Sequence, residues 1–267
     1  MTRTPDFLER IIEQKRERLA RSMTLRTLEE LRREAARVRS EAKPHALRTA
    51  LERSDNFNII AEIKRASPSL GDIRKDISPS KLAREYERGG AAAISILTEE
   101  DNFKGSLGDL REVRAVTALP LLRKDFIVDE WQLYEAAAAR ADALLLIVAA
   151  LNDATLARLR GITEEELGMD ALVEVHTAEE MGRAASCGAK LIGVNNRNLH
   201  SFEVTLETSV NLIGDSPPGV LLVSESGLRT QADLRRLKAL GYQGFLIGEN
   251  FMRADRPAQA LSSLLAE

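Results

Sequence analysis

The chain has 267 residues, of which 44% are hydrophobic and 30% charged, a balance typical of a globular protein that can bury a sizeable core. Its formal net charge of −3 gives no bulk electrostatic argument for binding nucleic acid or an anionic membrane, and we expect neither partner. Cys187 is the only cysteine, which excludes an internal disulfide framework and a thiolate zinc cluster and favours a reducing, cytoplasmic setting.

Residues 1–53 have a helical pattern. Apolar side chains in TPDFLERIIEQKRERLA fall near one stripe of a helix, and a second charged helix is expected near residues 27–38. The start of the chain lacks the uninterrupted apolar core of a signal peptide, and no later run approaches the length of a membrane span. We therefore predict an N-terminal helical extension over residues 1–53, packed on a catalytic domain over residues 54–267.

After Phe57, short apolar runs alternate with longer charged helical segments. Eight runs are typical of buried strands: NIIAEI, AAISIL, PLLRK, ALLLIV, ALVEV, LIGVN, VLLVSE and GFLIG. Their C-terminal ends are spaced as parallel strands with helical crossovers require. Eight such units predict a closed (β/α)₈ TIM barrel. A doubly wound open sheet is the structural alternative, although no Gly-rich dinucleotide turn follows the first run.

Charged residues gather at the predicted C-terminal ends of the strands, where the active sites of such barrels lie. Glu62 and Lys64 close the first strand and, being two residues apart, share the face that looks toward the barrel mouth. Lys124, Glu174 and Glu225 close three other strands. A single such pair fits a structural network equally well. Five ionisable groups from four strand ends favour a functional site, because burying them for stability alone is inefficient.

Two further features indicate what this site binds. Gly227 and Gly248 follow the last two strands, where loops with free backbone N–H groups form the usual phosphate cradle of these barrels. Phe103 and Phe126 lie in loops after the second and third strands; such residues often only cover the core, but beside a polar pocket they could enclose an aromatic substrate.

The sequence predicts no metal site. His45, His176 and His200 are the only histidines, and they show no metal-ligand spacing. Cys187, within a helical segment, is expected to pack in the interior.

Six segments together resemble the indole-3-glycerol-phosphate synthase family of tryptophan biosynthesis: IIAEIKRASPS, SILTEEDNFKGS, LLRKDFIVDEWQ, LVEVHT, GVNNRNL and VSESGL. They occur in family order and at family spacing over nearly the whole chain. The resemblance implies a (β/α)₈ barrel with an N-terminal helical extension. It also implies a carboxy-lyase that closes 1-(2-carboxyphenylamino)-1-deoxyribulose 5-phosphate into an indole with loss of CO₂ and water, and that needs no cofactor or metal.

The resemblance also assigns roles to residues of this chain. Lys124 is the candidate acid and pairs with Glu174, while Glu62 and Lys64 form a second acid/base pair; which pair serves which step stays open. Asn195 and Glu225 match positions that bind sugar hydroxyls and orient the lysines. The remaining candidates for substrate binding are Ser67, Arg197, Ser226, Gly227, Gly248 and Glu249. Glu249 is expected to offer its backbone N–H and to turn its carboxylate away from the phosphate.

Two other functions are compatible with these residues. A Schiff-base aldolase would use Lys124 or Lys64 as its nucleophile. A non-catalytic barrel would bind phosphosugars or partner proteins, although it has no reason to keep so many buried charges. The expected substrate is a small phosphosugar carrying an anthranilate group, and we expect a monomer or a weak homodimer.

Overall fold

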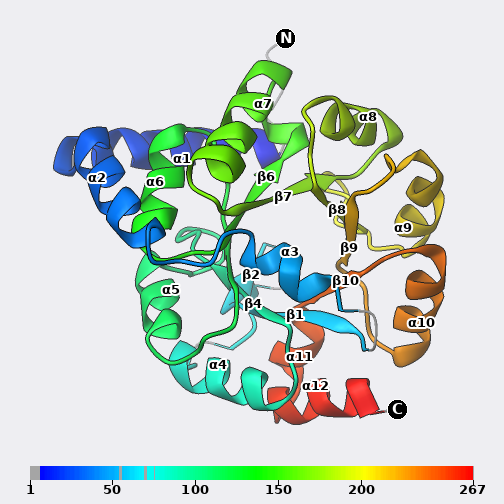
Figure 1. The fold of residues 1–267 in the computed structure, drawn as a ribbon. Helices are drawn as coiled ribbons and strands as arrows, with labels where there is room; N and C mark the ends of the chain where they lie inside the picture. The colour runs from blue at the N-terminus through cyan, green and yellow to red at the C-terminus, as the bar shows by residue number, and fades with distance from the viewer. Residues whose placement is uncertain (1–6, 54–55, 69–70, 75, 267) are drawn as a thin grey trace.

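The computed structural model describes residues 7–53, 56–68, 71–74 and 76–266. A closed parallel barrel forms its centre, with the strand order β1-β10-β9-β8-β7-β6-β5-β4 (Figure 1). The strands are β1 (Asn58–Ile63), β4 (Ala93–Leu97), β5 (Leu121–Lys124), β6 (Ala143–Ile147), β7 (Asp170–Val175), β8 (Leu191–Asn195), β9 (Leu221–Glu225) and β10 (Gly244–Ile247). Each matches a predicted run to within one residue at both ends. The predicted (β/α)₈ barrel is confirmed, and the open-sheet alternative is wrong.

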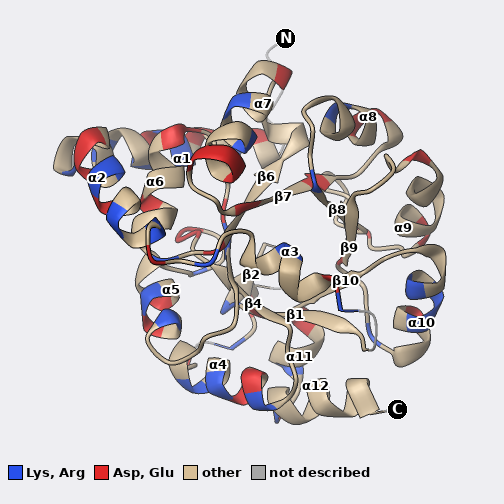
Figure 2. Ribbon diagram, viewed as in Figure 1, with Lys and Arg blue, Asp and Glu red and all other residues tan. Residues whose placement is uncertain are grey.

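Helices surround the barrel on its outside (Figure 1). They are α4 (Pro79–Arg88), α5 (Leu107–Arg114), α6 (Glu130–Ala138), α7 (Asp153–Gly161), α8 (Ala178–Ser186), α9 (Glu207–Leu212), α10 (Gln231–Leu240), α11 (Glu249–Arg253) and α12 (Pro257–Ala266). Short helical turns η1 (Val148–Ala150), η2 (Ile162–Glu166) and η3 (Ile213–Asp215) extend the connections. Charged residues are mainly on the helices, and the strands carry few (Figure 2). The strands are mostly apolar, as burial on both faces requires.

Capping residues set where these helices begin. Ser78 caps α4 by accepting a hydrogen bond from the Lys81 N–H, and Pro79 occupies the first helical position. Thr230 and Asp233 form a reciprocal capping box at the start of α10. These local signals end the connections before α4 and α10 at defined residues, and so help to fix the loops that line the barrel mouth.

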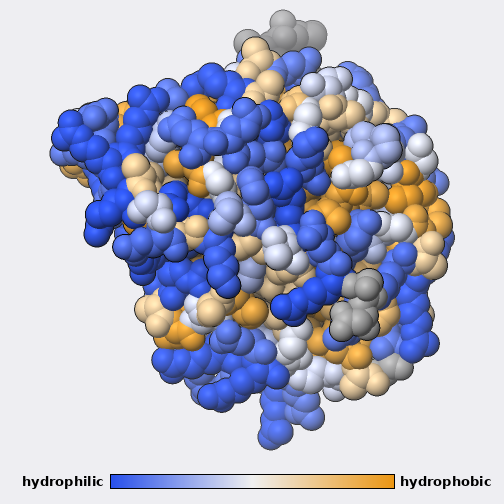
Figure 3. Space-filling model, viewed as in Figure 1, coloured by the Kyte–Doolittle hydropathy of each residue, from blue (hydrophilic) through white to orange (hydrophobic). Residues whose placement is uncertain are grey.

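The N-terminal region forms three helices, α1 (Phe7–Leu25), α2 (Leu28–Arg39) and α3 (Ala46–Leu51). Helix α2 packs against α6, and its outer face is hydrophilic in the space-filling view (Figure 3). Helix α3 lies across the N-terminal end of the barrel, near the centre of Figure 1. There the Arg48 side chain donates to Asp170, the first residue of β7, at 2.6 Å. The division into an extension and a barrel domain at residues 53 and 54 stays a prediction.

Helix α1 lies at the opposite end of the barrel, against the loops that follow the strands. Its residues Leu8, Ile11 and Ile12 share a buried cluster with Phe126. Two ion pairs extend this contact to neighbouring loops, Lys15 with Asp125 and Arg18 with Asp101. The helix therefore borders the mouth of the barrel.

A short antiparallel pair of strands, β2 (Ala66–Ser67) and β3 (Gly71–Asp72), follows β1 and was not predicted. Strands of two residues leave no periodic pattern in a sequence. None of the helices that the structure describes is long and apolar enough to cross a membrane.

Candidate active site

Charged side chains from four strands meet at the C-terminal end of the barrel. The Lys124 ammonium lies 2.9 Å from Oε2 of Glu174 and 2.5 Å from Oε2 of Glu225. The Lys64 ammonium lies 2.8 Å from Oε1 of Glu62. All three glutamates are almost fully buried. The structure thus brings together all five ionisable residues that the sequence places at these strand ends.

Strand alternation explains why Lys124 faces the barrel interior. Its neighbour Arg123 points to the opposite side of β5 and pairs with Glu135 on α6 at 2.8 Å. Asp125 accepts from Arg123 at 3.1 Å, away from the carboxylates around Lys124. Arg123 and Asp125 therefore belong to a separate buried network that faces α6 and α1.

Opposing electrostatic effects set the protonation state of each ionisable group in the site. Burial alone would lower the pKa of Lys124, but Glu174 and Glu225 raise it well above its ordinary value, so the side chain stays an ammonium. Burial works against the charged form of Glu174, but Lys124 and His176 outweigh it and lower the pKa of this carboxyl. Burial and the charge of Glu174 raise the pKa of Glu225 to about 7, despite Lys124. The two carboxyl groups on Lys124 thus differ in protonation near neutral pH.

Two glycines make room for the buried carboxylates. A Cβ atom on Gly193 in β8 would lie 2.1 Å from Oε1 of Glu225, and one on Gly248 would lie 2.2 Å from Oε1 of Glu62. Sequence reasoning missed Gly193, although a glycine inside a strand pattern is a signal for close approach of another group. Gly248 was predicted only for phosphate binding, and here it also borders Glu62.

The predicted phosphate-binding residues lie after β8, β9 and β10. Ser226 and Gly227 both have positive φ, 67° and 80°, a conformation that is strained for serine and is often kept at functional sites. The Arg197 N–H donates to Oδ1 of Asn195 at 3.0 Å. The Glu249 carboxylate lies 3.2 Å from the Arg197 guanidinium, and its direction relative to a bound phosphate stays a prediction.

The two loop phenylalanines lie side by side, with the ring centroids of Phe103 and Phe126 6.4 Å apart. Phe126 is 9% exposed and belongs to the same buried cluster as Ile11 of α1. Ser67 is buried in β2, within the connection that follows β1. The aromatic pair and the charged cluster therefore border the same end of the barrel.

Sequence reasoning missed two charged residues near the site. Lys15 of α1 is buried and reaches Asp125, a contact across the chain that no local pattern could reveal. His176 was considered only as a metal ligand, yet its Nε2 lies 3.4 Å from Oε1 of Glu174. The spacing Glu174-x-His176 at a strand end was the available signal.

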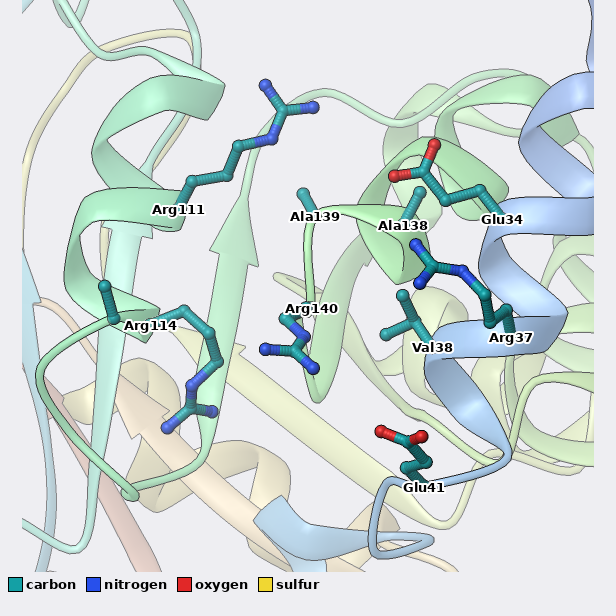
Figure 4. A pocket seen from close by; sticks show the side chains of 10 residues that line it. Glu34, Arg37, Val38, Glu41, Arg111, Arg114, Ala138, Ala139 and Arg140 are labelled. Atoms are coloured by element: carbon teal, nitrogen blue, oxygen red, sulfur yellow. The ribbon is translucent and has the colours of Figure 1, made fainter.

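A hollow among the described residues lies elsewhere, between α2, α5 and α6 (Figure 4). It has a volume of about 440 Å³ and is lined by Arg37, Arg111, Arg114 and Arg140 with Glu34 and Glu41 among its other residues. It opens at the C-terminal ends of α5 and α6, and so lies at the far end of the barrel from Lys124. Among the described residues no group of His, Cys, Asp or Glu side chains could hold a metal ion.

Comparison with known proteins identifies the family of this chain. The family model described as "Indole-3-glycerol phosphate synthase" matches residues 8–264. A relative of that name from Carboxydothermus hydrogenoformans is 46% identical over 97% of this chain and 100% of its own length. Another, from Leptothrix cholodnii, is 45% identical over 98% of this chain and 99% of its own.

The solved structure of KGPDC from Streptococcus mutans is similar in fold, with a TM-score of 0.62. It is 13% identical in sequence, and the match covers 78% of this chain and 95% of that one. At that identity the likeness concerns the barrel fold alone.

Proposed function

Because the chain belongs to the indole-3-glycerol phosphate synthase family, we propose that it closes 1-(2-carboxyphenylamino)-1-deoxyribulose 5-phosphate into indole-3-glycerol phosphate, with loss of CO₂ and water. The observation that carries the proposal is a buried ammonium, Lys124, held between two carboxyl groups of different protonation. This arrangement offers a fixed positive charge, a base and a second acid within one site, which is what the reaction requires.

Ring closure is the step assigned to Lys124. The aromatic carbon that bears the carboxylate attacks the C2 carbonyl of the ribulose, and negative charge develops on the carbonyl oxygen. The Lys124 ammonium neutralises that charge and then delivers the proton. Because the neighbouring carboxylates hold this proton tightly, the positive charge acts first and proton transfer follows as the oxygen becomes basic.

Decarboxylation restores part of the aromaticity, and dehydration then needs an acid for the leaving hydroxyl and a base for the departing proton. Glu174, with its lowered pKa, is suited to act as a base at neutral pH. The Glu62–Lys64 pair supplies a second acid and base at 2.8 Å. Asn195 and Glu225 are assigned to holding the sugar hydroxyls and orienting the lysines.

The remaining predicted residues are assigned to substrate binding. Phe103 and Phe126 would enclose the aromatic ring from one side of the mouth. Arg197 and the loops carrying Ser226, Gly227, Gly248 and the Glu249 backbone would hold the phosphate. Ser67 would contact the substrate from the loop after β1. Lys64 could neutralise either the phosphate or the carboxylate as a point charge. The protein is expected to act in the cytoplasm, as a monomer or weak homodimer, without a metal or a cofactor.

The direct test is to mix the protein with the carboxyphenylamino-deoxyribulose phosphate and follow indole fluorescence together with CO₂ release. We expect both signals to rise with equal stoichiometry. An aldolase would instead form a Schiff base, and borohydride would then trap a covalent adduct on Lys124 or Lys64. Absence of the indole signal, with or without such an adduct, would overturn the proposal.

A further inference from the structure

His176 lies between two carboxylates at the end of β7. Its Nε2 is 3.4 Å from Oε1 of Glu174, and its Nδ1 is 3.2 Å from Oε2 of Glu180 in the first turn of α8. The side chain is only 12% exposed. The ring therefore connects a buried carboxylate of the proposed site to the neighbouring helix.

Glu180 fixes the position of this histidine in two ways. Besides facing the ring, its Oε2 accepts the backbone N–H of His176 at 2.7 Å. In an ordinary capping box a glutamate at this helix position would bind the backbone of the capping residue, which is Thr177 here. By reaching one residue further back, Glu180 holds both the backbone and the ring of His176.

Glu174 uses its two oxygens for different partners. Oε2 accepts from Lys124 at 2.9 Å, while Oε1 faces Nε2 of His176. The Nε2 atom is buried, and at 3.4 Å it makes no regular hydrogen bond with any described residue. A contact of this length commonly shortens when substrate closes a site.

We propose that His176 is a positioning residue which, as an imidazolium, holds the Glu174 carboxylate ionised and turned toward Lys124. This inference rests on the proposed function, since Glu174 is the base assigned above. With both ring nitrogens protonated, one donates toward Glu180 and the other toward Glu174. In the neutral ring only one nitrogen carries a proton. If that proton is on Nδ1 and donated to Glu180, Nε2 has a lone pair, which faces Oε1 of Glu174 and repels it.

The charges around His176 agree with this state. Burial lowers the pKa of the ring, but Glu180 and Glu174, with a smaller contribution from Glu225 on β9, outweigh burial and raise that pKa above 6.5. Lys124 of β5 stands on the far side of Glu174 and is already paired with it. The histidine should therefore keep its charge to a higher pH than a free imidazole does, and lose it as the pH rises further.

Kinetic pH profiles provide the first test. The wild-type kcat should fall on the alkaline side as His176 loses its proton. His176→Gln should lower kcat roughly tenfold to hundredfold with KM within about twofold. It should also remove the contribution of His176 to the alkaline limb and leave that of Glu225, whose pKa is about 7. Glu180→Gln should keep the limb but move it to lower pH. Glu179→Gln is the matched control, because Glu179 is exposed in the same helical turn, and it should leave the profile unchanged.

Titration of the His176 imidazole by NMR provides a test that does not depend on turnover, with the signal assigned by its absence in His176→Gln. Glu174→Gln and Glu180→Gln should each lower the midpoint, and Glu179→Gln should not. The inference is overturned if the titration midpoint of His176 is unchanged in Glu174→Gln. It is also overturned if His176→Gln keeps the wild-type kcat and alkaline limb. Loss of the proposed function would instead appear as a wild-type protein that makes no indole product.

Discussion

The Nζ atom of Lys15 lies 2.7 Å from Oδ1 of Asp125, the residue that follows Lys124 in the chain. Both side chains are buried, although Lys15 comes from the N-terminal helix α1 and Asp125 from the end of a barrel strand. Asp125 also binds Arg123 and the Thr98 hydroxyl. The N-terminal extension is therefore joined by a buried charge to the segment that carries the proposed acid.

Lys15→Met should destabilise the protein by about 2 to 4 kcal/mol, because the buried Asp125 carboxylate then keeps only one of its two positively charged partners, Arg123. Lys15 has a raised and Asp125 a lowered pKa. The ion pair therefore contributes to the free energy of unfolding at pH values above the pKa of Asp125 in the unfolded chain and below that of Lys15 in the unfolded chain. It is lost as the pH falls through the folded pKa of Asp125 or rises through that of Lys15. Urea denaturation at neutral pH measures the loss.

A matched control for this change is Arg33→Ala, which removes the exposed pair with Glu29 on α2. An exposed i,i+4 pair contributes about 0.5 kcal/mol or less, so this variant should unfold close to the wild type. Equal effects of the two substitutions would show that the Lys15–Asp125 pair adds nothing beyond a surface contact.

The sequence predicted the barrel well because its signals are local. Each strand is a short apolar run, so the strand boundaries could be placed to within one residue, and several helices carry their own caps. Alternation along the first strand predicted that Glu62 and Lys64 share a face, and the other charges were predicted from their places at the ends of the strands. Lys15 and Gly193 could not be placed, because their roles depend on contacts between distant segments that only the closed barrel brings together. His176 and Glu180 are only four residues apart, but the direction of their side chains follows from the turn between β7 and α8.

Lys124→Ala and Glu174→Gln should each reduce kcat by about a hundredfold or more, while substrate still binds, because each removes a group assigned to proton transfer. Single-turnover kinetics with the proposed substrate would separate binding from chemistry. Near-normal turnover in both variants would contradict the assignment of this pair. Glu165→Gln, at an exposed position of the turn η2 before β7, serves as a control for changing a charge far from the site.

Glu225→Gln should make the fold more stable at pH 8 but not at pH 4. The rise in the pKa of Glu225 from 4.5 to about 7 means that ionising this carboxyl costs folding free energy, roughly 3 kcal/mol in all. The contribution of Glu225 to the free energy of unfolding is fully present below pH 4.5, because the folded protein holds the proton more tightly than the unfolded chain. It declines as the pH rises toward 7. Glutamine mimics the protonated form and removes that decline. Thermal melts of both proteins across this pH range would show the difference, and parallel curves would contradict the prediction.

Gly193→Ala should reduce turnover strongly while the barrel stays folded. The new methyl group would meet Oε1 of Glu225 at 2.1 Å, and the flexible carboxylate would swing away and lose its contact with Lys124. Gly182→Ala in α8 is the matched control, since nothing lies within 4 Å of its added Cβ. The shorter side chain of Glu225→Asp should relieve the clash, so the double variant should regain stability relative to Gly193→Ala alone. Full activity in Gly193→Ala would show that Glu225 needs no such clearance.

Glu249→Gln should strengthen binding of the phosphorylated substrate. The Glu249 carboxylate faces the Arg197 guanidinium at 3.2 Å, so it competes with any phosphate that this arginine attracts. Removing the negative charge at this partly exposed position should lower KM by about fivefold, an effect of roughly 1 kcal/mol at the effective dielectric of a protein surface, and should leave kcat unchanged. Inorganic phosphate should inhibit the variant at lower concentration than the wild type. Arg197→Gln should have the opposite effect on KM. If Glu249→Gln raised KM instead, the carboxylate would be acting to orient Arg197 toward the phosphate, and the idea of competition between them would be wrong.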